Sequence, residues 1–213
     1  MARPSSTQKR ALEEAARTYH ESLLENERAA LYLDRRGLWT DEAVDGFRLG
    51  YVEEPILDEH EHYRGRISIP YLTPAGVSTI KFRCIKDHDC KGIDRHAKYL
   101  PGNDLLYNVQ ALHDADERIY VLEGEFNAIV MELIGCPTLA TGSAAKWYPH
   151  WTRLLESYPE VVVVRDPDDA GKAFAKKVRD QVSWARVIEM PEGEDPNSIY
   201  VNYGPDELEN RLT

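Results

Sequence analysis

Apolar and polar residues recur along the chain with two periods, and the first is that of a helix. Residues 7–33 contain good helix formers throughout, and the apolar positions recur at helical spacing. Those apolar positions are Leu12, Ala15, Ala16, Tyr19, Leu23 and Leu24. We therefore predict one helix over 7–33, ended by Gly37, and a second short helix from Thr40 or Asp41 to about Phe47.

Short β-rich runs replace the helical period between Arg66 and Ile85. Residues 66–71 and 78–83 flank Thr73-Pro74-Ala75-Gly76, a turn signal typical of a hairpin. Residues 86–98 are polar and basic, and we expect a loop there.

From Ile119 onward strands and helices alternate. The pattern predicts strands at 119–122, 137–140, 160–164 and 185–189, and helices at 125–134, 147–157 and 170–182. Such alternation favours a mostly parallel sheet covered by helices. We therefore expect an α/β chain, with an α+β subdomain over 1–116 followed by a parallel-sheet domain over 117–213.

Acidic residues follow two of these strands. Glu123 comes directly after 119–122, and Gly124 is expected to let the backbone turn there. Asp166 and Asp168 follow the valine run 161–164, and their i, i+2 spacing puts both on one side of an extended backbone. Simpler interpretations exist, since Glu123 suits the start of a helix and Asp168 or Asp169 suits an N-cap. Neither interpretation explains Asp166, which would be an unpaired charge at the end of a buried strand.

A third acidic stretch, 190–197, follows the last predicted strand and contains Asp195 in an Asp-Pro pair typical of a surface turn. Acidic loops at the carboxyl ends of successive parallel strands converge in space, because those ends share one edge of the sheet. Carboxylate oxygens are the ligands that Mg²⁺ prefers. The sequence therefore predicts a site for one or two magnesium ions.

Charge is distributed unevenly. The net charge is −11, yet residues 64–98 carry 8 basic and 3 acidic side chains. Such a segment can bind phosphate locally, although a solvated loop would have the same composition. Cys84, His88, Cys90 and His96 cluster there without the C-x2-4-C spacing of a zinc site, so we expect no zinc. No window has the roughly 18 apolar residues of a membrane span, and the N-terminus has no apolar signal stretch, so we expect a cytoplasmic protein.

The two acidic motifs resemble the signatures of the Toprim domain. They read Leu122-Glu123-Gly124-Glu125-Phe126-Asn127 and Asp166-Pro167-Asp168-Asp169-Ala170-Gly171. Toprim domains occur in DnaG-type primases, topoisomerases, and some nucleases and recombination proteins. The flanking sequence resembles the primase catalytic core in particular, through an ordered series of shorter motifs. These are Arg36-Gly37-Leu38, Phe47-Arg48-Leu49-Gly50-Tyr51, Arg66-Ile67-Ser68-Ile69-Pro70, Lys81-Phe82-Arg83, Lys98-Tyr99-Leu100-Pro101, Ala140-Thr141-Gly142-Ser143 and Gly193-Glu194-Asp195-Pro196.

The resemblance implies a phage- or mobile-element-like primase core that makes short RNA primers on single-stranded DNA from nucleoside triphosphates. It implies Mg²⁺, with Mn²⁺ as a substitute, and no zinc-binding or helicase-binding domain in this chain. A replicative helicase or a separate zinc-binding subunit would then be a partner. The implied catalytic residues are Glu123, Asp166 and Asp168, and these three together with Asp195 would bind the metal. The residues implied to face nucleotide or template are Arg66, Lys81, Arg83 and Lys98. Glycines are implied at turns at Gly124, Gly142 and Gly171.

Two positions depart from the family pattern. Asn127 and Asn197 stand where primases commonly carry aspartate, so the second metal site is expected to be weaker. Two alternatives stay open, a Toprim nuclease that activates water with the same acids and a non-catalytic nucleic-acid-binding accessory protein. A topoisomerase is disfavoured, because no strand-passage domain or clear tyrosine nucleophile accompanies the motifs.

Overall fold

The computed structural model describes residues 5–86, 105–143 and 146–212, and the backbone of 97–99. The chain forms two compact units, Met1–Asp104 and Leu105–Thr213. The boundary expected at 116/117 lies inside the second unit, because Leu106 and Ala111 belong to that unit's apolar core. No helix in the described residues is long and apolar enough to cross a membrane.

The first unit begins with two helices where one was predicted. Helix α1 covers Ser6–Leu24 and α2 covers Glu27–Asp34. The prediction of one continuous helix over 7–33 is wrong because the Asn26 side chain accepts a hydrogen bond from the Ala29 N–H and starts a new helix. The short helix predicted after Thr40 is α3, Asp41–Val44, capped by the Thr40 hydroxyl.

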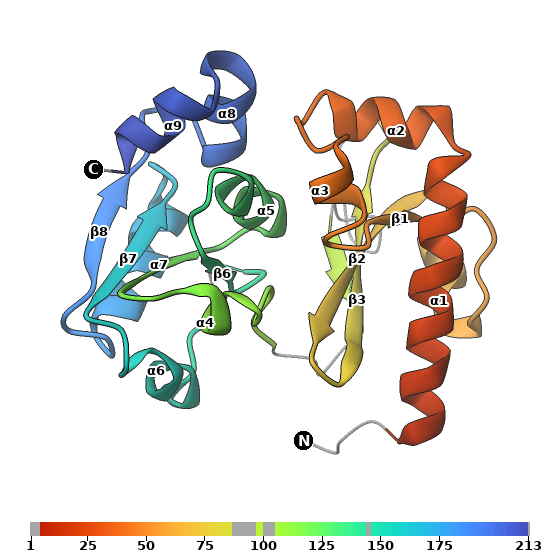
Figure 1. Ribbon diagram of the computed structural model, residues 1–213, viewed down its shortest axis with the longest axis horizontal. Coiled ribbons are helices and arrows are strands. Elements are labelled where there is room, and N and C mark those ends of the chain that lie inside the picture. Colours follow the sequence, from red (N-terminus) through yellow and green to blue (C-terminus); the bar gives the residue numbers. More distant parts are fainter. Residues whose placement is uncertain (1–4, 87–96, 100–104, 144–145, 213) are drawn as a thin grey trace. The chain divides into compact units, whose positions relative to one another are not determined.

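A four-stranded antiparallel sheet completes the first unit (Figure 1). Its order is β1-β2-β3-β4, with β1 at Gly50–Tyr51, β2 at Arg66–Thr73, β3 at Gly76–Cys84 and β4 at Ala97–Tyr99. Strands β2 and β3 form the predicted hairpin, whereas β4 lies in the stretch expected to be a loop. The core consists of one face of α1 packed on this sheet, with Leu12, Ala15, Tyr19, Ile80 and Phe82 buried in it.

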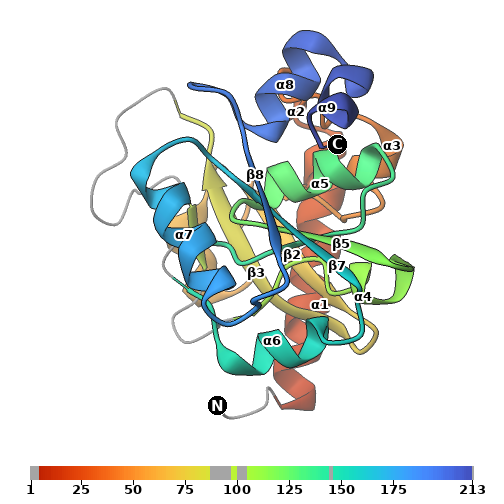
Figure 2. The same cartoon turned by 90° about the vertical axis from the view of Figure 1, so that its left-hand side faces the viewer.

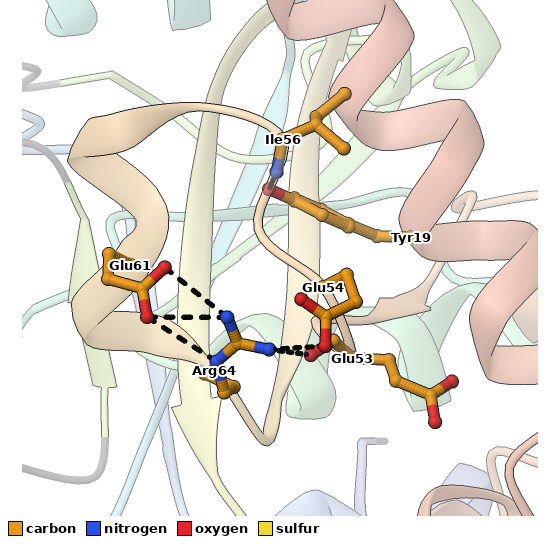
Figure 3. A network of polar contacts seen from close by, with 6 residues as sticks. All are labelled: Tyr19, Glu53, Glu54, Ile56, Glu61 and Arg64. Carbon is orange, nitrogen blue, oxygen red and sulfur yellow. Dashed lines mark hydrogen bonds and ion pairs between the residues drawn. The ribbon is translucent and has the colours of Figure 1, made fainter.

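Polar contacts hold the 3₁₀ helix η1, Asp58–Tyr63, to the rest of the first unit (Figure 3). The Tyr19 hydroxyl accepts from the Ile56 N–H at 3.2 Å and lies 3.0 Å from Nδ1 of buried His60. The Arg64 guanidinium lies 2.6 Å from the Glu54 carboxylate and also pairs with Glu61. These contacts fix both ends of a segment that has little regular structure of its own.

The second unit contains a four-stranded parallel sheet of order β6-β5-β7-β8. Its strands are β5 at Arg118–Leu122, β6 at Thr138–Ala140, β7 at Glu160–Arg165 and β8 at Arg186–Glu189. All four coincide with predicted strands to within a few residues. The α/β class, with a parallel sheet flanked by helices, is therefore confirmed.

Helices cover both faces of the parallel sheet, as Figure 2 shows. One face packs against α4 (Ala111–Asp114), α6 (Pro149–Leu155) and α7 (Asp169–Arg179) through a core that includes Trp151, Phe174, Val161 and Val163. On the other side lie α5 (Glu125–Leu133), α8 (Pro196–Tyr203) and α9 (Pro205–Arg211). Helices α8 and α9 were not predicted, although each starts with proline at its first helical position, where a missing N–H costs no hydrogen bond.

Candidate active site

The parallel sheet brings two acidic residues to one edge. Glu123 directly follows β5 and Asp166 directly follows β7. The two strands are neighbours and run parallel, with Val121 opposite Val163. Both carboxylates therefore leave the sheet at its carboxyl end, where α/β proteins bind ligands.

Two further acids lie at helix starts near that edge. Asp168 is the N-cap of α7, and its Oδ1 accepts from the Gly171 N–H at 2.7 Å. Asp195 is the N-cap of α8 and accepts from the Ser198 N–H at 2.7 Å. The N-cap interpretation of Asp168 is thus correct, and Asp195 opens a helix where a simple surface turn was the alternative. A cap occupies one lone pair of a carboxylate and leaves its other oxygen for a ligand.

The acids perturb one another electrostatically. Burial raises the pKa of Glu123 to about 7, with further contributions from the negative charges of Asp166 and Asp168. Burial also raises the pKa of Asp166 to about 6, helped by Asp195 and Asp168. The set therefore gathers negative charge that the fold alone does not neutralise.

Glu123 also leaves one oxygen without a partner. Its Oε1 is buried and has no hydrogen-bond partner among the described residues. Within the same described part, no three His, Cys, Asp or Glu side chains are already arranged to enclose an ion. An orphaned carboxylate oxygen beside Asp166 and Asp168 fits a hard divalent cation, which takes oxygen ligands.

Two residues hold the Asp166 backbone in place. A Cβ added at Gly171 would lie 2.2 Å from the Asp166 carbonyl oxygen, so only glycine fits there. The Arg165 guanidinium donates to the same carbonyl at 2.9 Å and forms an ion pair with Glu189. The motif marked Gly171 only as a turn residue. Arg165 was missed, although a charge that ends a four-valine run was a signal for it.

The other two glycines of the predicted site differ in their backbone needs. Gly142 has φ +68°, a conformation that L side chains rarely adopt. Gly124 has φ −98° and ψ 141°, which any residue can adopt, and an added Cβ would only reach ordinary contact with Asn127 at 3.7 Å. The chain bends between β5 and α5, but the backbone at position 124 does not require glycine.

The two asparagines that depart from the family pattern contact each other. The Asn127 side-chain carbonyl accepts from the Asn197 N–H at 3.2 Å and so ties α5 to the start of α8. Asp195 lies two residues before this link. An amide at position 127 thus helps to place the third acidic loop, a role that the sequence did not suggest.

The four basic residues expected to face nucleotide or template do not share one face of the first unit's sheet. Lys81 and Arg83 are two residues apart on β3 and therefore share one face of the sheet, where they pair with Ile69 and Ile67 of β2. Arg66 pairs with Cys84, which puts it on the opposite face, and its guanidinium lies 5.9 Å from the Tyr63 ring. Lys98 is placed by its backbone alone, opposite Phe82.

Of the cysteine and histidine cluster, only Cys84 is described, buried at the end of β3. His88, Cys90 and His96 lie outside the described residues.

Comparison with known proteins gives a consistent picture. Residues 120–200 match a family model described as Toprim-like. The Gene 57 protein of Mycobacterium phage D29 is 36% identical over 156 residues, which cover 70% of this chain and 99% of that protein. The DNA primase of Lactococcus lactis is 27% identical over 236 residues, which cover 90% of this chain and 36% of that protein. The chain thus spans only about a third of the length of that primase.

Solved structures agree in fold over nearly the whole chain. The RNA polymerase domain of Mycobacterium tuberculosis primase DnaG superposes with a TM-score of 0.79 at 21% identity, covering 99% of this chain and 84% of that one. A DnaG primase catalytic domain solved with single-stranded DNA gives 0.73 at 19% identity, covering 98% and 82%.

Proposed function

Since this chain belongs to the family of DnaG-type primase catalytic cores that carry a Toprim domain, we propose that it synthesises short RNA primers on single-stranded DNA. Its substrates are nucleoside triphosphates, its cation is Mg²⁺ with Mn²⁺ as a substitute, and it acts in the cytoplasm. The observation that carries the proposal is the carboxylate set, in which the buried, unpartnered Glu123 Oε1 lies near Asp166 and Asp168.

Each acid has a proposed role. Asp166, Asp168 and Asp195, with Glu123, would hold the cation at the carboxyl edge of the sheet. A divalent cation bound there lowers the pKa of the attacking hydroxyl and offsets charge on the phosphates. Glu123 is in addition suited to accept the proton of the 3′-hydroxyl as it attacks the α-phosphate and pyrophosphate leaves.

The basic residues of the first unit are proposed to bind phosphate. Arg83, half-buried on β3, would contact a phosphate of template or nucleotide, and the buried Lys81 lies beside it on the same face. Arg66 and Lys98 would then contact another part of the nucleic acid. A replicative helicase and a separate zinc-binding subunit remain proposed partners, and primer synthesis by the isolated chain would show that neither is obligatory.

The test is an incorporation assay. The protein is incubated with a single-stranded DNA template, labelled nucleoside triphosphates and Mg²⁺ or Mn²⁺, and the products are separated by length. We expect short RNA that depends on both template and divalent cation. Degradation of the DNA without incorporation would favour the Toprim nuclease, and binding without either reaction would favour the accessory protein; both results would overturn the proposal.

Metal binding gives a readout independent of activity. Mn²⁺ titrated into the protein should lose its free-ion electron paramagnetic resonance signal with the wild type and retain it with Asp166→Asn. Asp169→Asn is the matched control, because Asp169 is the first residue of α7 and its fully exposed side chain pairs with Lys172. Equal Mn²⁺ binding by all three proteins would contradict the metal assignment.

A further inference from the structure

Positive charge gathers on one surface of the second unit, on residues that lie outside the basic segment 64–98 of the sequence. An open groove of about 550 Å³ runs between α7 and the edge strand β8. It is lined by four cations, Arg165, Lys172, Lys176 and Arg179, and by one acid, Asp180. Figure 2 shows α7 beside β8 at this side of the sheet. A basic groove is unexpected in a chain of net charge −11.

Three of the cations form a row along the helix. Lys172, Lys176 and Arg179 are spaced i, i+4 and i+7, so they share one stripe of α7. With a rise of about 1.5 Å per residue, the row extends about 10 Å. A row of this length can reach consecutive phosphates of one extended single strand. An open row of this length suits an extended polyanion better than a single phosphate.

The cations remain available to a ligand. Lys172 lies 3.5 Å from Asp169 and Lys176 lies 2.7 Å from Asp180, but all four side chains are more than half exposed. Exposed pairs of this kind contribute little free energy, so phosphate can replace the carboxylates. Arg179 makes no ion pair within the part of the chain described.

A second groove, on α1 of the first unit, provides a contrast. Its lining includes four cations, Lys9, Arg10, Arg17 and Arg48, together with the acids Glu13 and Glu14. Arg48 and Glu13 form an ion pair at 2.8 Å. The lining of the α1 groove thus has two more cations than acids, whereas the lining of the α7 groove has three more cations than acids.

Two features point to a nucleic-acid strand as the ligand. Trp184 directly follows the groove-lining Ser183 in the sequence and is 41% exposed, and an exposed indole suits base stacking. Arg165, at one end of the groove, is bonded to the backbone of Asp166 in the candidate active site. A strand in the groove would therefore lead to the carboxylate set.

We propose that the α7 groove binds the phosphate backbone of single-stranded DNA through Lys172, Lys176 and Arg179, with a base stacked on Trp184. This inference rests on the proposed function, because it names a second template contact on the Toprim-like unit. The residues lie outside the four basic positions that the sequence motifs indicate.

The test measures the binding of a labelled single-stranded oligonucleotide by fluorescence anisotropy over a range of salt concentrations. The variant is Lys172→Gln/Lys176→Gln/Arg179→Gln, since glutamine removes charge and keeps helix propensity. Each lost phosphate contact lowers the slope of log K against log salt by about 0.7, so the slope should fall by about 2. Lys9→Gln/Arg10→Gln/Arg17→Gln removes the same charge from α1 and should leave the slope unchanged.

Two single variants separate the parts of the proposal. Arg179→Gln should lower the slope by about 0.7 even if the triple variant folds poorly. Trp184→Ala should weaken binding at least about fivefold with no change in slope, because stacking releases no counterions, while Trp184→Phe should retain affinity.

The outcomes are distinguishable. An unchanged slope in the α7 variants, or an equal loss in the α1 control, would overturn the α7 groove and leave the proposed function standing. Weakening of duplex binding alone, or no effect of Trp184→Ala, would also overturn it. No binding of DNA by the wild type would count against the proposed function and this inference together.

Discussion

Replacing Glu123 with glutamine should stabilise the second unit at alkaline pH while it abolishes primer synthesis. The substitution removes a charge and retains the shape of the side chain. Glu123 has an ordinary carboxyl pKa of 4.5 when exposed and a pKa of about 7 in the fold. Ionised Glu123 is therefore disfavoured in the folded state, and the wild type should bear that cost for function.

The size and pH window follow from the shift. Because the folded pKa is raised, the folded state binds more protons than the unfolded state between pH 4.5 and 7, so stability falls as the pH rises through that range. A shift from 4.5 to about 7 corresponds to about 3 kcal/mol. Glu123 is only partly buried, so solvent screening reduces this to about 1–2 kcal/mol. The cost is complete above pH 7 and absent below pH 4.5.

Urea unfolding of the metal-free protein measures the effect. Trp147 and Trp151 are buried in the second unit's core, so their contribution to the tryptophan fluorescence reports on that unit. Glu123→Gln should be about 1–2 kcal/mol more stable than the wild type at pH 8 and equally stable at pH 4.5. Glu117→Gln, an exposed control at the start of β5, should change neither value. Lower stability of Glu123→Gln at pH 8, or the same gain at both pH values, would refute the reasoning.

Two further predictions concern other parts of the molecule. Gly171→Ala should lower the free energy of unfolding by about 1–3 kcal/mol and strongly reduce primer synthesis, because the added Cβ would displace the Asp166 backbone. Gly124→Ala should lower the free energy of unfolding by less than about 1 kcal/mol, and urea unfolding and incorporation assays check both variants. Burial lowers the pKa of His60 to about 4, so the protein should lose about 3 kcal/mol of unfolding free energy as the pH falls from 6.5 to 4. His60→Gln should remove that part of the decline measured by urea unfolding, and an unchanged decline would contradict the prediction.

Much of the second unit is predictable because its signals are local. The runs 119–122 and 160–164 are apolar and β-branched, and each is directly followed by an acid, so strand and carboxylate are predicted together. Helix α8 was missed because Asp195-Pro196 is typical of a turn and also of a helix start, and sequence alone does not separate the two.

What could not be predicted depends on contacts between segments distant in sequence. The alternation of β3 puts Lys81 and Arg83 on one face, but the position of Arg66 depends on its pairing with Cys84, which the hairpin register sets. The Asn127–Asn197 link joins residues 70 positions apart. The break at Asn26 depends on one side-chain hydrogen bond within a stretch of good helix formers.

The central claim is that four carboxylates at the end of the parallel sheet support nucleotidyl transfer. Incorporation of labelled nucleotide on single-stranded DNA, compared across Glu123→Gln, Asp166→Asn, Asp168→Asn and Asp195→Asn, tests it directly. Asparagine is as good an N-cap as aspartate, so the changes at 168 and 195 remove charge and retain the caps of α7 and α8. All four variants should lose primer synthesis while Asp169→Asn retains it. Wild-type activity in Glu123→Gln and Asp166→Asn, or an equal loss in Asp169→Asn, would contradict the claim.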